Sequence, residues 1–180
     1  MARTAKRLAA DGRFETADRP SGQTSVHESS TAFIHDFPRN AAVAYADIFR
    51  ADPYERVEMI RNGVPAAAVR DMFEAIPIAS GDLLKSLRLS PATLSRKIKE
   101  DANLSSEDSE RVIGMARLIG QVQSMAGDAP GFDAARWTAS WLLEPVPALN
   151  GARPVDLMDT MEGQGIVSRL LSQMESGAYA

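Results

Sequence analysis

Helix-start and helix-stop signals follow one another along most of this chain, and no stretch alternates apolar and polar residues for long. Asp52 before Pro53 combines a capping residue with a proline at the first helical position, and Asn62-Gly63 ends that segment. The next segment carries an apolar stripe at helical spacing, formed by Val69, Met72, Phe73 and Ile76. The pattern predicts an all-α fold of about seven to nine helices.

Later signals extend the same pattern to the end of the chain. Ser105 and Asp108 resemble a capping box, and the helix that they begin should stop near Gly127. Asp133 is a candidate cap for a helix that carries two tryptophans one turn apart. The segment Pro145 to Pro154, with three prolines and Asn150-Gly151, should be a stiff loop. Two final helices are expected over residues 154–161 and 165–176.

Composition narrows the class of protein. Cysteine is absent, which excludes disulfides, thiol catalysis and thiolate metal sites and fits a cytoplasmic location. The first residues lack the apolar run of a secretory signal, and no run is long enough to span a membrane. The net charge of −4 argues against a protein that coats nucleic acid generally.

Residues 1–40 are polar and without period, so we expect a disordered N-terminal arm. His27 and His35 both lie in it, without cysteine or helical register, and their spacing gives a poor zinc site. We expect one domain over residues 41–127 and a second over 128–180. We expect no metal and no cofactor.

The segment SGDLLKSLRLSPATLSRKIKE, residues 80–100, has the spacing of a helix-turn-helix. One helix should end near Leu87, and Ser90 with Pro91 should begin the next. Leu94 and Ile98 lie one turn apart and can pack inward together. The other face would then read DNA from a recognition helix. The candidate DNA-binding residues are Ser90, Thr93, Ser95, Arg96, Lys97 and Lys99.

The charge of this segment supports the interpretation that it binds DNA. Residues 81–100 hold five lysines and arginines against two acidic residues, a balance of +3 in a chain whose total is −4. Phosphate contacts by such cations would supply affinity, and a dimer would read paired half-sites. The alternative is an ordinary solvated face on a short surface helix, and the acidic residues that follow limit the extent of any basic surface.

Three other patterns have ordinary structural explanations. Gly163-Gln164-Gly165 resembles half a phosphate loop but has no strand before it, so we interpret it as a helix end followed by a new helix. The acidic cluster of Asp156, Asp159 and Glu162 lacks a histidine or cysteine, and acids suit the first turn of a helix, so we expect no catalysis. The tryptophans Trp137 and Trp141 could stack on bases, but core packing fits them better.

Taken together, three blocks resemble the Xre/MbcA/ParS family of bacterial antitoxins, with the ParS branch the nearest. They are LRLSPATLSRKIKEDANLSSEDSERVIGMARLI, WTASWLLEPVPALNGARPVDLMDTMEG and IVSRLLSQMESGAYA. The specific features are the order of the blocks and the succession Trp-Leu, Pro-Ala-Leu-x-Gly and Pro-x-Asp-Leu. The resemblance runs from about Val64 to Ala180. The chain departs from the family at Val146-Pro147, where Asn-Pro is common, and at Ala152-Arg153, where a threonine often caps the next helix.

The resemblance implies an Xre-like helix-turn-helix domain followed by a C-terminal helical toxin-binding domain. The implied partner is a RES-class toxin, related to ADP-ribosyltransferases and acting on NAD, whose NAD pocket the antitoxin would block. The implied complex, containing an antitoxin homodimer, would bind operator DNA and repress its own operon. The chain would not be an enzyme. Candidate toxin-binding residues are Pro147, Asn150, Gly151, Arg153, Asp156 and Tyr179.

A second interpretation remains open at this point. A stand-alone helix-turn-helix regulator, with no toxin partner, would need only the segment from Ser90 to Glu100.

The departure at Arg153 also affects the loop, because its side chain cannot accept a hydrogen bond from the first N–H groups of the next helix.

Overall fold

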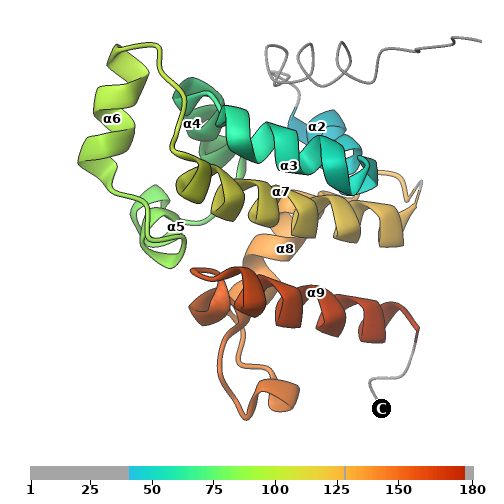
Figure 1. The fold of residues 1–180 in the computed structure, drawn as a ribbon. Coiled ribbons are helices and arrows are strands. Elements are labelled where there is room, and N and C mark those ends of the chain that lie inside the picture. The colour runs from blue at the N-terminus through green and yellow to red at the C-terminus, as the bar shows by residue number, and fades with distance from the viewer. Residues whose placement is uncertain (1–40, 128, 177–180) are drawn as a thin grey trace, which may run out of the picture.

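The computed structural model describes residues 41–127 and 129–176, and within these ranges the fold is all-α, as the sequence predicts (Figure 1). The only extended pairing among them is an isolated bridge between Pro65 and Asn103. The α-helices and short 3₁₀ helices are α2 (Ala41–Arg50), α3 (Pro53–Asn62), α4 (Ala66–Ala75), α5 (Ser80–Ser86), α6 (Pro91–Lys99), α7 (Ser106–Ala126), α8 (Ala134–Leu143), η1 (Pro147–Leu149), η2 (Pro154–Leu157) and α9 (Met161–Glu175).

The capping residues predicted from the sequence begin the helices that they were expected to begin. Asp52 accepts a hydrogen bond of 2.8 Å from the Tyr54 N–H, and the Glu55 carboxylate accepts one from the Asp52 N–H, which completes a capping box on α3. The other predicted caps accept from the third residue of their own helix; they are Ser90 on α6, Ser105 on α7 and Asp133 on α8.

Helix α7 is the centre of the molecule. It is 21 residues long and contacts α2, α3, α8 and α9, and in Figure 1 it runs across the middle with α3 on one side and α9 on the other. Its buried side chains point in several directions: Met115 and Ile119 share one face, and Ile113 and Leu118 lie on other sides of the helix. One hydrophobic core therefore continues from the α2–α6 region into α8, η2 and α9.

Two glycines of α7 allow its neighbours to approach closely. A Cβ at Gly120 would lie 2.0 Å from the Tyr45 carbonyl oxygen of α2, and one at Gly114 would lie 1.6 Å from Oε1 of Gln164 on α9. At Gly120 the neighbour is backbone, so that contact requires glycine, whereas at Gly114 a larger residue would displace the Gln164 side chain from its present position.

Two buried glutamines fix α9 against α7. Gln121 of α7 donates to the Ser168 carbonyl oxygen at 3.0 Å and accepts from the Ser168 hydroxyl at 2.7 Å. Gln164 of α9 donates in return to the Arg111 carbonyl oxygen of α7 at 3.1 Å and to that of Met158 at 2.9 Å. Paired polar groups of this kind favour one alignment of the two helices over a sliding apolar contact.

The end of the chain differs from the sequence prediction in its helix boundaries. The expected helix over residues 154–161 is only the 3₁₀ turn η2, and α9 begins at Met161 instead of Gly165. Thr160 explains the earlier start, because its hydroxyl accepts from the Gly163 N–H at 3.1 Å and caps α9. Gly163-Gln164-Gly165 thus lies inside the first turns of a helix.

Some predictions fall outside the described residues. These are the disordered arm over residues 1–40 with His27 and His35, and Tyr179 near the C-terminus. Among the helices of the described ranges, none combines the length and apolar character that crossing a bilayer requires.

Candidate functional site

The turn between α5 and α6 is a Schellman motif with an arginine at the position that glycine usually takes. The Leu89 N–H donates to the Leu84 carbonyl oxygen at 2.8 Å, and the Arg88 N–H donates to that of Lys85 at 3.0 Å. Arg88 has a φ of 50°, in the left-handed region. That conformation costs a residue with a Cβ about 1–2 kcal/mol. The buried side chains on either side, Leu87 and Leu89, hold the turn in place.

Helix α6 buries one face and exposes the other. Leu94 is buried and Ile98 packs against the core, as the sequence predicts. The candidate DNA-binding residues divide into two groups. Thr93 and Lys97 are half-buried, and the Lys97 ammonium group donates to the Asn103 carbonyl oxygen at 2.6 Å. The exposed members are Ser90, Ser95, Arg96 and Lys99.

The cations of the helix-turn-helix are more neutralised than the sequence suggested. Arg96 pairs with Glu100 one turn later, at 2.9 Å. Arg88 pairs at 2.6 Å with Asp159, a residue far away in the sequence that lies just before α9. Lys99 is exposed, with no ion pair to any residue of the described ranges. The local excess of positive charge is therefore partly paired within the chain itself.

The loop between α8 and η2 projects from the body of the molecule, and it is the lowest part of the ribbon in Figure 1. Backbone hydrogen bonds to the N–H and to the carbonyl oxygen of Val146 close the loop on itself. The Val146 N–H donates to the Ala152 carbonyl oxygen at 3.1 Å, and the Val146 carbonyl oxygen accepts from Leu149 and Gly151. Asn150 and Gly151 take positive φ values of 55° and 83°. The loop thus has a fixed shape, held by its own backbone hydrogen bonds and by the buried Val146 side chain.

Candidate toxin-binding residues surround this loop. Pro147, Asn150 and Gly151 are exposed on it, and Val146 is its buried anchor. Arg153 and Asp156 follow and form a two-point ion pair, with Nη2 to Oδ1 at 2.7 Å and Nε to Oδ2 at 3.1 Å. Arg153 is therefore not a free projecting cation, because the carboxylate that it suits lies three residues away.

In the acidic cluster that we expect to be non-catalytic, Asp156 and Asp159 each form an ion pair with an arginine. The hydrogen bond from Arg153, reinforced by its charge, holds the pKa of the Asp156 carboxyl below its usual range. Asp159 is paired with Arg88. A general acid requires a pKa raised toward neutrality, so Asp156 is shifted in the opposite direction. In agreement with the sequence interpretation, Arg153 provides no side-chain cap for η2.

Comparison with known proteins connects both surfaces to one family. Residues 55–117 match the family model of the antitoxin Xre-like helix-turn-helix domain, and residues 124–177 match that of the antitoxin Xre/MbcA/ParS C-terminal toxin-binding domain. A "Prs ADP-ribosylating antitoxin" of Sphingobium sp. (strain YBL2) is 44% identical over 140 residues, which cover 76% of this chain and 88% of that protein. The chain belongs to the Xre/MbcA/ParS antitoxin family.

A second relative is more distant. The "Antitoxin Xre" of Yersinia enterocolitica serotype O:8 / biotype 1B (strain NCTC 13174 / 8081) is 24% identical over 124 residues, covering 69% of this chain and 80% of that protein. The antitoxin thus contains a helix-turn-helix domain and a toxin-binding domain in the order that the sequence suggested. The matched ranges end and begin within α7, the helix that both halves of the core share.

A cleft of about 340 Å³ separates α5 of the antitoxin from η2 and the residues beside it. Ile78, Leu143 and Val155 contribute the apolar surface of the cleft. Its charged lining consists of Asp82, Lys85 and the two arginine–aspartate pairs. The Arg88–Asp159 pair spans this cleft. This contact cannot be predicted from the sequence, because neither residue belongs to a motif that relates it to the other.

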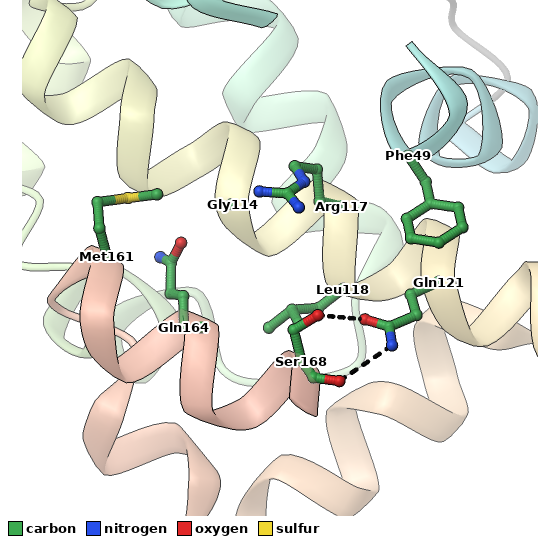
Figure 2. A pocket seen from close by; sticks show the side chains of 9 residues that line it. Phe49, Gly114, Arg117, Leu118, Gln121, Met161, Gln164 and Ser168 are labelled. Atoms are coloured by element: carbon green, nitrogen blue, oxygen red, sulfur yellow. Dashed lines mark hydrogen bonds between the residues drawn. The ribbon is translucent and has the colours of Figure 1, made fainter. Parts of the chain in front are cut away.

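A smaller pocket of about 120 Å³ lies between α2, α7 and α9 (Figure 2). Arg117 is its charged residue, and Gln121 and Ser168 are hydrogen-bonded to each other at its edge. Oε1 of Gln164 and Nε of Arg117 are buried there without a hydrogen-bond partner in the described ranges. The size and polar lining suit a few water molecules.

The tryptophans of α8 pack as the sequence interpretation expected. Trp137 and Trp141 stack with ring centroids 5.9 Å apart and planes inclined by 11°. Both are partly buried and contact the hydrophobic core. Leu143, which follows them, is 40% exposed and lines the cleft beside α5. The tryptophan pair therefore packs at the edge of the hydrophobic core.

Proposed function

We propose that this antitoxin neutralises a RES-class toxin by blocking its NAD pocket, and that it represses its own operon by binding operator DNA. The observation that carries the first part is the closed loop over residues 146–152. It lies inside the range that matches the toxin-binding domain, and its exposed residues carry no packing role within the chain. A backbone already held in one conformation loses little entropy when it docks on a partner.

The chemistry of the partner follows from the most similar relative discussed above. That protein is named as an antitoxin concerned with ADP-ribosylation of Prs, and we infer that the toxin paired with this chain also transfers ADP-ribose from NAD. In this proposal the loop residues Pro147, Asn150 and Gly151 enter the toxin, with the Arg153–Asp156 pair at its rim. Tyr179 is a further proposed contact. The antitoxin itself performs no reaction and needs no cofactor.

Growth of bacteria that express both proteins tests the neutralisation. The loop variant Asn150→Asp/Gly151→Asp would add two charges to the tip, and we expect it to lose toxin binding and to stop growth when the toxin is co-expressed. Arg169→Asp, on the exposed side of α9, is the matched control and should still neutralise. Neutralisation by the loop variant at the level of the parent chain would refute the proposed role of the loop.

The DNA-binding part of the proposal rests on the exposed face of α6. Ser95, Arg96 and Lys99 lie on that face, and the exposed cap Ser90 lies at the N-terminal end of α6, the end that enters the major groove in such a helix. Thr93 and Lys97 remain proposed contacts at the edge of this face. One copy offers few phosphate contacts, so we propose that a homodimer reads paired half-sites. The proposed location is the cytoplasm, where operator DNA and toxin are both present.

Electrophoretic mobility shifts with the DNA upstream of the gene test this face. We expect Arg96→Ala/Lys99→Ala to weaken binding at least tenfold, since each lost base or phosphate contact contributes about 1–3 kcal/mol. Toxin neutralisation should persist. Arg61→Ala, on α3, is the control because its cation is equally exposed but lies on another helix. Unchanged DNA affinity in the α6 variant would instead favour a toxin inhibitor without DNA binding.

A further inference from the structure

Arg88 occupies a backbone position that its side chain makes unfavourable. It is the left-handed residue of the turn after α5, where glycine adopts the same conformation without steric cost. Asp101, two residues after the end of α6, has a similar φ of 49°, but aspartate tolerates that conformation better than arginine does. A residue that contradicts its local backbone preference marks a place where the side chain has a separate role.

The side chain of Arg88 reaches the toxin-binding domain. Its Nη2 atom lies 2.6 Å from Oδ2 of Asp159, across the cleft between α5 and η2. The arginine side chain remains 72% exposed, while the aspartate side chain is 20% exposed. The mostly buried Asp159 carboxylate is therefore held in place by its surroundings, whereas the exposed Arg88 guanidinium can turn away from it into solvent.

Arg88 also lies two residues before Ser90, the cap of α6. In a helix-turn-helix, the N-terminal end of the second helix is the part that enters the major groove, so the preceding turn lies near the phosphates. We propose that Arg88 contacts a DNA phosphate in the bound state, exchanging the Asp159 carboxylate for it. This inference rests on the DNA-binding part of the proposed function and adds a residue outside the α6 face.

Because of this exchange, Asp159 lowers the affinity of the chain for DNA. Each DNA-binding event must first break the Arg88–Asp159 pair. Exposed ion pairs of this type are weak, so the competition lowers affinity only about two- to fivefold. The toxin-binding domain thereby reduces the DNA affinity of its own helix-turn-helix without covering it.

Three variants of the full chain test the exchange: Asp159→Asn, Arg88→Gly and the two combined. Asparagine keeps the size of the aspartate, and glycine suits the left-handed turn, so both substitutions preserve the fold. Binding is measured as a function of salt on a duplex of unrelated sequence and on the DNA upstream of the gene, because a phosphate contact forms on both. Thermal unfolding of each variant verifies that it is folded.

We expect Asp159→Asn to bind both DNAs about two- to fivefold more tightly, because no pair must be broken. Arg88→Gly should reduce the slope of log K against log salt by about 0.9 for each bound protomer. In the Arg88→Gly background, Asp159→Asn should bring no gain. The proposal is overturned if Arg88→Gly leaves the salt slope unchanged, or if Asp159→Asn raises affinity equally with and without Arg88.

Two control variants distinguish a failure of this inference from a failure of the proposed DNA binding on which it rests. Glu162→Gln removes one exposed negative charge from the start of α9 without touching Arg88, and should leave affinity unchanged. Arg96→Ala/Lys99→Ala reports on the α6 face alone. If that variant loses affinity while Arg88→Gly keeps its salt slope, only the exchange fails. If it binds normally, the proposed DNA-binding face itself fails.

Discussion

The α5–α6 turn and the loop over residues 146–152 both connect two helical segments through left-handed residues and a following proline, but they obtain their shape differently. In the turn, Leu87 and Leu89 are buried on either side of Arg88, so packing against the core fixes the backbone. In the loop, five backbone hydrogen bonds close the chain on itself, and Val146 is the buried anchor. Packing orients a recognition helix relative to its domain, whereas internal hydrogen bonds leave a loop tip free to contact another molecule.

The sharpest test of this difference is the loss of one apolar side chain from each element. Leu87→Ala should lower the free energy of unfolding by about 2–5 kcal/mol, because Leu87 is fully buried. Leu149→Ala in the loop should cost less than about 1 kcal/mol, because that side chain is half-buried outside the core. Urea denaturation measures both values, and equal losses would contradict the distinction.

Exchanging the left-handed residues should affect stability unequally in the two elements. Gly151→Ala introduces a Cβ at a φ of 83°, which should cost about 1–2 kcal/mol although the space around it is open. Arg88→Gly relieves the same kind of strain but loses an ion pair, so its free energy of unfolding should change by less than about 1 kcal/mol. Thermal unfolding of the two variants side by side checks the difference.

The prolines that begin α6, after the turn, and η2, after the loop, allow a third comparison. Ser90 before Pro91 accepts a hydrogen bond from the Thr93 N–H, whereas Arg153 before Pro154 provides no side-chain cap. Ser90→Ala should therefore destabilise the protein by about 1 kcal/mol. Arg153→Ala should have a smaller effect on the free energy of unfolding, since only an exposed ion pair is lost. A larger loss for Arg153 would show that the ion pair holds the loop closed.

The smallest expected effect concerns the Arg153–Asp156 pair. Arg153→Gln should raise the pKa of Asp156 toward the usual aspartate value, because the hydrogen bond that lowers it is lost. Since the native pKa is depressed, the stabilisation by the pair is complete above the usual aspartate pKa of about 3.9 and is lost as pH falls through the depressed value. NMR titration of the carboxyl group measures the shift, and Arg169→Gln should leave it unchanged.

Local signals explain which parts of the fold could be predicted. Asp52, Ser90, Ser105 and Asp133 act on backbone groups two or three residues away, so their role can be inferred from the sequence alone. The start of α9 was placed too late because Gly163 and Gly165 suggested a break. The Thr160 cap and the close approach of Gly163 to the Leu157 carbonyl oxygen favour a helix there instead.

Contacts between distant parts of the chain could not be predicted. The sequence showed Arg88 as one cation among five, and only the fold places Asp159 beside it. The same holds for Arg153: the sequence predicts a projecting cation, whereas the turn of η2 places Asp156 beside it. The exposed face of α6 was inferred from helical spacing, but the contact of Lys97 with Asn103 depends on the loop after that helix.

The central position of α7 has a consequence for how such proteins can evolve. One matched family range ends at residue 117 and the other begins at residue 124, both inside this helix, and its side chains pack on both halves at once. Recombination that exchanged the C-terminal half for that of another antitoxin would join two different helices in mid-length. The new half would have to fit Gly114 and Gln121 as the old one does. With the loop as the toxin contact that we propose, partner specificity would diverge more easily through substitutions in this loop than through exchange of whole domains.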